Sequence, residues 1–503
     1  MTIEPNLHGS LTLSSSERCP RCSVGASGAA SRRDFLHDFS TGLAGIALTS
    51  LLLEDGALAA AADEAGGLTS LPHHPPRAKR VLQIFLSGGL SHVDSFDYKP
   101  ELEQHRGQRM PADFELDVFS PDKIGVLTPS HFPFRRRGDS GQWISDLFPE
   151  IARLADKLTF IRSMVSSSGD HGPAAFEANS GFRTGGFPAM GAWISYGLGS
   201  ENENLPTFVV FPDVRGLPGS GVSNWTNAFL PAQHQGTMFH AEGAAVRNLQ
   251  SPEPLPPETR AARLRLLESL NRRDLERRGN DEAFAARIRS YELAARMQRS
   301  IPEAVDLSKE TEATQRQYGL DRDVTRPFGR SCLMARRLVE RGVRFVQLWS
   351  GGNIGQRQAW DAHEHVRTNH LHQAERIDRP VAGLLRDLEQ RGLLDDTLVV
   401  FNTEFGRLPF SQAERGTHGD GRDHNQNGFT VWLAGAGLKP GFSYGETDQF
   451  GYAASVNPVA PPDFHGTILH LLGIDHERLT YYHSGIRRRL TDVSGSVIRE
   501  IFA

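Results

Sequence analysis

The chain has 503 residues, of which 38% are hydrophobic and 23% are charged, and its formal net charge is -5. This composition is typical of a water-soluble globular protein, and it excludes a polytopic membrane protein and a wholly disordered chain. A net negative charge does not favour the basic surface that nucleic-acid binding requires, so we expect no nucleic-acid partner. The length allows two or three structural units, or one large α/β domain with insertions.

The first predicted element is an export signal at the amino terminus. Arg32 and Arg33 precede a modest apolar run over residues 39–53, and small residues follow near Ala59. This pattern resembles a twin-arginine signal, in which a receptor reads the paired arginines. An amphipathic first helix is the alternative, but the run carries almost no charge. We therefore expect residues 1–62 to direct the chain through the twin-arginine export machinery to the periplasm or beyond, leaving no stable membrane span after cleavage.

Residues 63–79 are predicted to form a linker, and short apolar runs of the type found in buried strands follow it. The runs are mostly continuous rather than alternating, which is typical of strands covered on both faces. Helical patterns separate the runs, and this alternation predicts a mainly parallel β-sheet sandwiched between helices. The predicted strands are 81–86, 158–161, 207–211, 343–349, 397–402 and 429–434, and the predicted helices are 145–157, 189–197, 330–341, 372–391 and 464–472.

A charged segment over residues 252–300 interrupts this alternation. Its apolar residues recur at three- and four-residue spacing, which predicts a helical insertion packed on the core. The α/β domain is therefore expected to span residues 80–503, with insertions at about 213–325.

Candidate metal ligands follow the predicted strands, because ligands of parallel α/β sheets bind beyond the carboxyl ends of the strands. Asp361 and His365 are four residues apart, which on a helical turn or in a tight loop points both side chains the same way. His424, just before the run 429–434, is the expected third ligand. Solvent-exposed loop histidines are the plain alternative. Together the three residues predict a divalent cation, and the imidazole and carboxylate donors suit zinc or manganese better than magnesium or calcium.

Further chemistry-bearing residues follow three other strands. Glu404 and Arg407 suit a metal ligand and an anion clamp, although a Glu–Arg salt bridge would explain the same residues. His92 and Asp94 could supply a second metal position, so one or two ions are expected. His171 leads into a predicted helix whose free amides would attract an anion.

Several segments together resemble one family of exported proteins, domain of unknown function family 1501. The resemblance covers nearly all of the chain after the signal. It implies an alkaline phosphatase-like and sulfatase-like superfamily fold, with one or two divalent metals at the carboxyl edge of a parallel sheet. The segments that carry it are 32–36, 88–94, 191–199, 224–232, 403–407, 421–425 and 464–473.

Carried over by position, the superfamily's Asp-x3-His pair falls on Asp361 and His365, and its late histidine falls on His424. The second metal site of the superfamily usually takes an Asp-His pair. This chain has Glu404 and Phe405 there, so a carboxylate remains and an imidazole is lost. His171 occupies the position of the nucleophile, where no cysteine, serine or threonine is available. The resemblance therefore disfavours a formylglycine-type sulfatase.

The leading hypothesis from the sequence is an exported metal-dependent hydrolase of phosphate or sulfate esters, with sulfated or phosphorylated carbohydrate as a candidate substrate. The attacking group would be metal-bound hydroxide, or His171 through a phospho-histidine. His171 could equally be a ligand of a second metal with Glu404 and Asp94. The alternative is a catalytically inactive sulfatase-like relative that binds an anionic polysaccharide or a partner protein.

Overall fold

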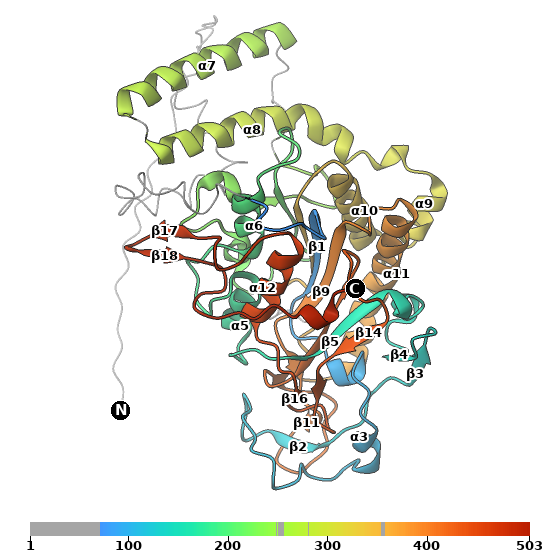
Figure 1. The fold of residues 1–503 in the computed structure, drawn as a ribbon. Helices are drawn as coiled ribbons and strands as arrows, with labels where there is room; N and C mark the ends of the chain where they lie inside the picture. Colours follow the sequence, from blue (N-terminus) through green and yellow to red (C-terminus); the bar gives the residue numbers. More distant parts are fainter. Residues whose placement is uncertain (1–70, 248, 250–255, 280, 354–357) are drawn as a thin grey trace, which may run out of the picture.

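A computed structural model describes residues 71–503 except 248, 250–255, 280 and 354–357, so the predicted export signal lies outside the described residues. An eight-stranded sheet forms the centre of the structure (Figure 1), in the order β14-β5-β13-β9-β1-β8-β6-β7. Its strands are β1 (Arg80–Leu86), β5 (Leu158–Met164), β6 (Phe208–Phe211), β7 (Thr237–Met238), β8 (Phe345–Ser350), β9 (Thr397–Thr403), β13 (Phe429–Ala434) and β14 (Phe442–Tyr444).

The directions of these strands decide which loops meet. β1 pairs in parallel with β8 and β9, and β6 pairs in parallel with β8. β13 is antiparallel to both of its neighbours, β5 and β9. Because β13 runs the opposite way, the residues that precede it lie at the edge where the parallel strands end. The predicted fold, a mainly parallel sheet between helices, is confirmed.

Two apolar cores lie on the two faces of the sheet. Leu82 and Ile84 of β1 belong to one core, and Val81 and Phe85 belong to the other. Burial on both faces explains why the strands are continuous apolar runs in the sequence. The first face is covered by α10 (Arg326–Glu340) and α11 (Val366–Gln390), and the second by α6 (Met190–Leu198) and α12 (Pro461–Leu471) (Figure 1).

One predicted helix, over residues 145–157, is wrong as a continuous element. Strand β4 (Gln142–Ser145) ends where that helix was expected to begin. Pro149 then begins a short helix, α4 (Pro149–Ala152), and a 3-10 turn follows over Ala155–Lys157. The interruption has a simple cause, because proline fits the first turn of a helix but not its interior.

The charged segment between the sheet strands forms two long helices, α7 (Pro257–Arg278) and α8 (Glu282–Ala304). α8 buries Met297 and Ile301 against the first core. α7 lies outermost (Figure 1) and keeps four leucines exposed. In the described part of the chain, no helix is both long enough and apolar enough to cross a membrane.

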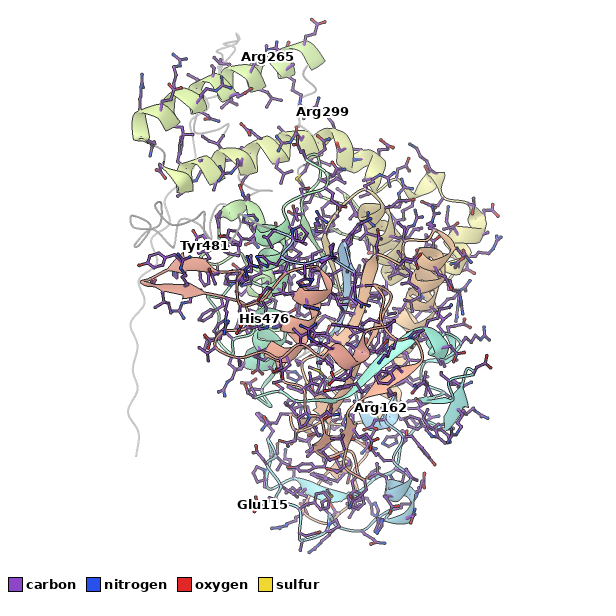
Figure 2. All side chains as sticks on the ribbon, viewed as in Figure 1. Glu115, Arg162, Arg265, Arg299, His476 and Tyr481 are labelled. Atoms are coloured by element: carbon purple, nitrogen blue, oxygen red, sulfur yellow. The ribbon has the colours of Figure 1, made fainter. Side chains whose placement is uncertain are left out.

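Smaller elements surround the edge of the sheet where the parallel strands end. Strand β10 (Gly406–Arg407) pairs with β12 (His424–Asn425) and sets Arg407 opposite His424. The other short elements are α3 (Pro100–Gln104), α5 (His171–Ser180), α9 (Glu312–Gln317), β2 (Ile124–Leu127), β3 (Phe134–Arg137), β11 (Phe410–Gln412), β15 (Glu446–Thr447), β16 (Ala454–Val456), β17 (Tyr481–His483) and β18 (Ile486–Arg488). Figure 2 shows the side chains on this framework.

Candidate metal centre

Four side chains converge at the edge where the parallel strands end. Their donor atoms all lie within 4.8 Å of one another. His171 begins α5 after β5, Asp361 and His363 follow β8, and His424 precedes β13. The Nε2 atoms of His363, His424 and His171 lie 3.0, 3.4 and 3.5 Å from Oδ1 of Asp361. Three imidazole nitrogens and one carboxylate therefore face a single point.

Each of the three imidazole rings is held from behind through its other nitrogen. The partner atoms are all oxygen acceptors, so each Nδ1 carries a proton and each Nε2 faces the centre. Acceptors placed in this way orient the histidine ligands of protein-bound metals. The pairs are His171 with Glu404 (2.8 Å), His363 with the side-chain oxygen of Gln412 (2.6 Å) and His424 with the carbonyl of Gly169 (2.6 Å).

The charges around the centre hold Asp361 ionised. Burial alone would raise the pKa of Asp361, but the Arg407 charge and the three histidines hold it well below its usual range. Burial also opposes protonation of His171, yet contacts with Asp361 and Glu404 raise its pKa to about 9. Burial and the nearby positive charges lower the pKa of His424 to about 3. At neutral pH the cation-free centre thus holds a proton on His171, and His424 is neutral.

His365 lies outside the centre, in contrast to the sequence prediction. Its ring contacts the carboxylate of Asp420, and its side chain is 62% exposed. A helical turn or a suitably tight loop would align Asp361 and His365, but α11 begins only at Val366. The loop before α11 instead turns Asp361 and His363 to the same point. The Asp-x-His spacing of these two residues was the only sequence signal for His363.

The backbone of Gly421 passes close to His363 and fixes the position of that ligand. A Cβ atom at residue 421 would lie 1.8 Å from the His363 carbonyl oxygen. We therefore expect Gly421→Ala to displace His363 and to lower the content of bound metal, although no ligand is removed. Elemental analysis of the dialysed protein measures this. Gly185→Ala is the matched control, because its nearest neighbour is 3.6 Å away; equal metal content in both variants would contradict the expectation.

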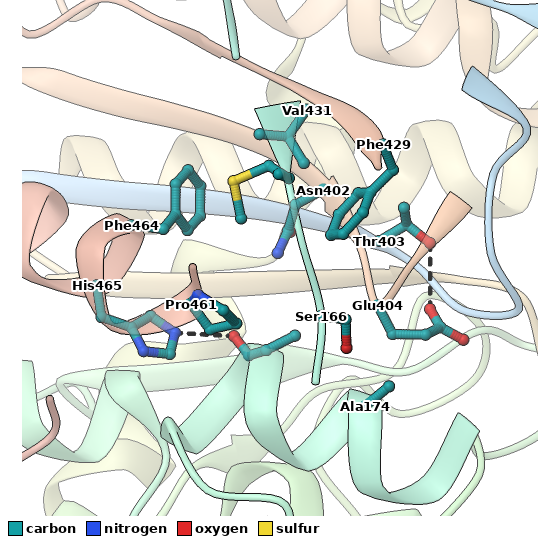
Figure 3. Close-up of a pocket in the computed structure, with 12 residues that line it drawn as sticks. Ser166, Ala174, Asn402, Thr403, Glu404, Phe429, Val431, Pro461, Phe464 and His465 are labelled. Carbon is teal, nitrogen blue, oxygen red and sulfur yellow. Dashed lines mark hydrogen bonds between the residues drawn. The ribbon is translucent and has the colours of Figure 1, made fainter. Parts of the chain in front are cut away.

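Glu404 supports the centre from behind. Its side chain is 1% exposed. Oε1 accepts hydrogen bonds from the Gly88 amide at 2.7 Å and from His171, and Oε2 accepts one from Thr403 at 3.1 Å (Figure 3). In this structure Glu404 therefore orients His171, and it is not one of the four converging side chains.

Arg407 donates mainly to the protein itself. Its side chain is completely buried, and one terminal nitrogen lies 2.7 Å from Oδ1 of Asp361. Three further N–H groups donate to the carbonyls of Gly88, Gly89 and Arg422, so four of its five N–H groups have acceptors. The predicted anion clamp would need two free donors on one guanidinium, and the structure leaves one. The Glu–Arg salt bridge considered as its alternative is replaced by the contact with Asp361.

His92 and Asp94 do not join the centre. Asp94 pairs with Arg422 at 2.8 Å and accepts a hydrogen bond from the His131 amide. His92 binds the Gly451 carbonyl through Nε2 at 2.7 Å. Among the residues that the structure describes, the four converging side chains are the one group suited to a metal ion. The second metal position predicted at residues 92 and 94 is therefore not formed there.

A small cavity lies behind Glu404, between β9, β13, α5 and α12 (Figure 3). Its volume of about 10 Å³ is at the lower limit for one water molecule. The cavity therefore admits no ligand larger than water. Of the four converging side chains, that of His363 is the most exposed, at 36%.

Comparisons with known proteins place the fold in context. No curated protein matches the sequence. The matching solved structures include three that are 9–12% identical to this chain, with TM-scores of 0.38, 0.34 and 0.30. The first is a lipoteichoic acid synthase from Listeria monocytogenes, with 9% identity over 89% of this chain and 81% of that chain. The second is the alkaline phosphatase of the Antarctic bacterium TAB5, with 9% identity over 79% of this chain and 98% of that chain. The third is a phosphonate monoester hydrolase from Silicibacter pomeroyi, with 12% identity over 65% of this chain and 68% of that chain.

The family comparison extends over most of the chain. Residues 78–502, which include the whole central sheet and all four converging side chains, match a single protein family. This confirms the resemblance carried by the sequence motifs. The chain belongs to the family described as "Protein of unknown function (DUF1501)".

Proposed function

We propose that this protein is an exported metal-dependent hydrolase of phosphate or sulfate esters. One observation carries the proposal: three imidazole Nε2 atoms and the carboxylate of Asp361 face one point, and each ring is fixed from behind by an acceptor oxygen. Lone pairs directed at each other repel unless a cation or a proton lies between them. Three nitrogen donors and one carboxylate suit zinc or manganese.

The surroundings of the His171 Nε2 atom support the same conclusion. It is buried, and it has no hydrogen-bond partner among the described residues apart from the ion-pair contact with Asp361 at 3.5 Å. Buried polar atoms without close partners are uncommon in folded proteins, and a bound ion is a standard reason for one. Because Glu404 tethers the other nitrogen, His171 suits a ligand better than a free nucleophile. This favours water over a phospho-histidine as the route of attack.

The chemistry of ester hydrolysis requires stabilisation of negative charge. A divalent cation supplies a Lewis acid that lowers the pKa of a coordinated water and neutralises charge on the ester oxygens. The first amides of α5, those of His171 and Gly172, have no acceptor in the part of the chain that the structure describes. The positive end of this helix therefore adjoins the centre and would stabilise ester oxygens in place of Arg407.

Turnover with metal present tests the proposal. The full chain, loaded with zinc or manganese, is assayed against aryl phosphates, phosphodiesters and aryl sulfates. We expect hydrolysis of at least one class, and its loss in Asp361→Ala and His424→Ala. His365→Ala is the control and should remain active. Bound metal without turnover on any ester would overturn the hydrolase and support the inactive relative that binds an anionic polysaccharide or a partner protein.

Export and location form a separate part of the proposal. The twin-arginine pattern at Arg32 and Arg33 supports passage through the twin-arginine machinery to the periplasm or the medium. That pathway transports folded proteins, which fits a cation bound before export. Residues 1–62 fused to a reporter should export it, and Arg32→Lys with Arg33→Lys should block that export; an unchanged reporter distribution would contradict the location.

Metal binding is expected to release about one proton at pH 7. The pKa of His171 is raised to about 9, so its Nε2 proton must leave before the lone pair can bind, whereas His424 is already neutral. Affinity should therefore rise by about tenfold per pH unit between pH 7 and 9, and level off above that range. Titration calorimetry in buffers of different ionisation enthalpy counts the released protons. An affinity that is independent of pH over this range would contradict the expectation.

A further inference from the structure

A second polar pocket opens at the same edge of the sheet as the metal centre. It lies where β6 and β8 end, against α10 and α11, and Asp213, Ser350 and Arg376 are its polar residues together with Ser331. Phe328 and Trp349 are among its apolar walls. Its volume is about 10 Å³, which admits one atom the size of a water oxygen.

Arg376 brings an unmatched positive charge to this pocket. Its side chain is half-buried and makes no hydrogen bond or ion pair within the described ranges of the chain. Burial and the charge of Arg215 lower its pKa, and the carboxylates of Asp213 and Glu242 offset this only in part.

Asp213 is the nearby carboxylate, and it is already neutralised. Arg215 donates to Oδ1 at 2.9 Å and to Oδ2 at 2.7 Å, and the Gly351 amide donates to Oδ2 at 2.9 Å. Asp213 and Arg215 therefore form a closed pair. Arg376 is therefore only partly compensated by nearby carboxylates, and its guanidinium donors are available to a ligand.

Ser350 adds a buried donor to the same pocket. It is 1% exposed, and its hydroxyl oxygen accepts a hydrogen bond from the Trp360 indole at 3.2 Å. The hydroxyl proton has no acceptor among the residues that the structure describes. Trp360 directly precedes Asp361, so Ser350 contacts the neighbour of one of the four converging side chains.

We propose that this pocket binds one oxygen of a second sulfate or phosphate group on the substrate, with Arg376 and Ser350 as its hydrogen-bond donors. A guanidinium binds such oxyanions with charge-assisted hydrogen bonds, and the pocket size limits entry to one of the anion's oxygens. The substrate class is therefore a molecule with more than one anionic group, such as a multiply sulfated or phosphorylated carbohydrate. The assignment to a substrate rests on the proposed hydrolase function, whereas anion binding in the pocket does not.

Sulfate titration of the metal-free protein tests the pocket without turnover. Sodium sulfate is titrated calorimetrically at constant ionic strength into chelator-treated full chain. We expect Arg376→Ala to weaken sulfate binding at least tenfold, and Arg376→Lys to weaken it less. Arg367, an exposed arginine on the same helix outside the pocket, gives the matched control Arg367→Ala. Equal sulfate affinity in Arg376→Ala and Arg367→Ala would overturn the proposal.

A substrate pair tests where the anion comes from. For two saccharide esters that differ in one additional sulfate, Arg376→Ala should raise KM of the doubly charged ester relative to the singly charged one. An unchanged ratio, despite loss of sulfate binding, would overturn the substrate assignment and leave a site for a free anion. If neither ester is hydrolysed, the proposed hydrolase function fails, but the pocket can still be tested. Calorimetric titration of the two saccharides into wild type and Arg376→Ala then measures whether the pocket favours the doubly charged one.

Discussion

His363→Ala is expected to abolish the retention of zinc or manganese, whereas His365→Ala should retain the metal as the wild type does. The Nε2 atom of His363 lies 3.0 Å from Asp361 inside the centre, and the ring of His365 turns away to Asp420. Loss of an outer hydrogen-bonding partner typically costs about 10- to 100-fold in metal affinity. Loss of a ligand should cost more than that. Elemental analysis after dialysis and competition with a chelating dye give the two affinities.

Glu404→Ala supplies the graded comparison for that experiment. It removes the acceptor behind His171 and keeps all four converging side chains, so about 10- to 100-fold weaker binding is expected. Circular dichroism of each variant shows whether the fold is retained. If His365→Ala lost the metal and His363→Ala kept it, the ligand set predicted from the sequence would be correct and the one in the structure would be refuted.

Arg422→Met is expected to destabilise the fold by about 3–5 kcal/mol, because it leaves the buried carboxylate of Asp94 without its positively charged partner. Arg422 and Asp94 are completely buried, 2.8 Å apart. Burial alone would raise the pKa of Asp94, and the Arg422 charge reverses this and lowers it. The pair therefore stabilises the fold above the unfolded pKa of about 4, and this contribution is lost as the pH falls further. Arg422 also donates to the carbonyls of Leu408, Thr128 and Pro129.

Chemical denaturation at pH 7 measures the free energy of unfolding for this variant. The control is Arg272→Ala, which removes an exposed ion pair with Glu268 and should cost at most about 0.5 kcal/mol. Should Arg422→Met fail to fold, Asp94→Asn provides a milder test of the same pair. A change below about 1 kcal/mol for both variants would show that this ion pair does not hold the loop before His424.

The sheet was predictable because its strands are buried on both faces and the sequence shows this as apolar runs. His171, Asp361 and His424 were identified for the same reason, since each adjoins such a run. The helix over residues 145–157 was wrong because Pro149 limits it to short turns. The position of His363 depends on where α11 begins, which short-range spacing does not encode.

Contacts between distant segments explain the site residues whose surroundings were not predicted from the sequence. Arg407 is the type of residue expected in an anion clamp, but its guanidinium donates hydrogen bonds to Asp361 and to three backbone carbonyls. Asp94 is the type of residue expected in a metal site, but Arg422, 328 positions away in the chain, neutralises its charge. Spacing along a single segment cannot reveal which distant group arrives beside it, because that depends on the assembled tertiary structure.

The reversed direction of β13 has a consequence for assembly of the protein during synthesis. His424 reaches its place only when β13 has inserted between β5 and β9. A nascent chain that ends before this strand carries His171, Asp361 and His363 without the fourth partner. On the proposed metal function, binding of the cation would therefore report that the late portion of the polypeptide has been made and folded, and an incomplete product would lack a full coordination set.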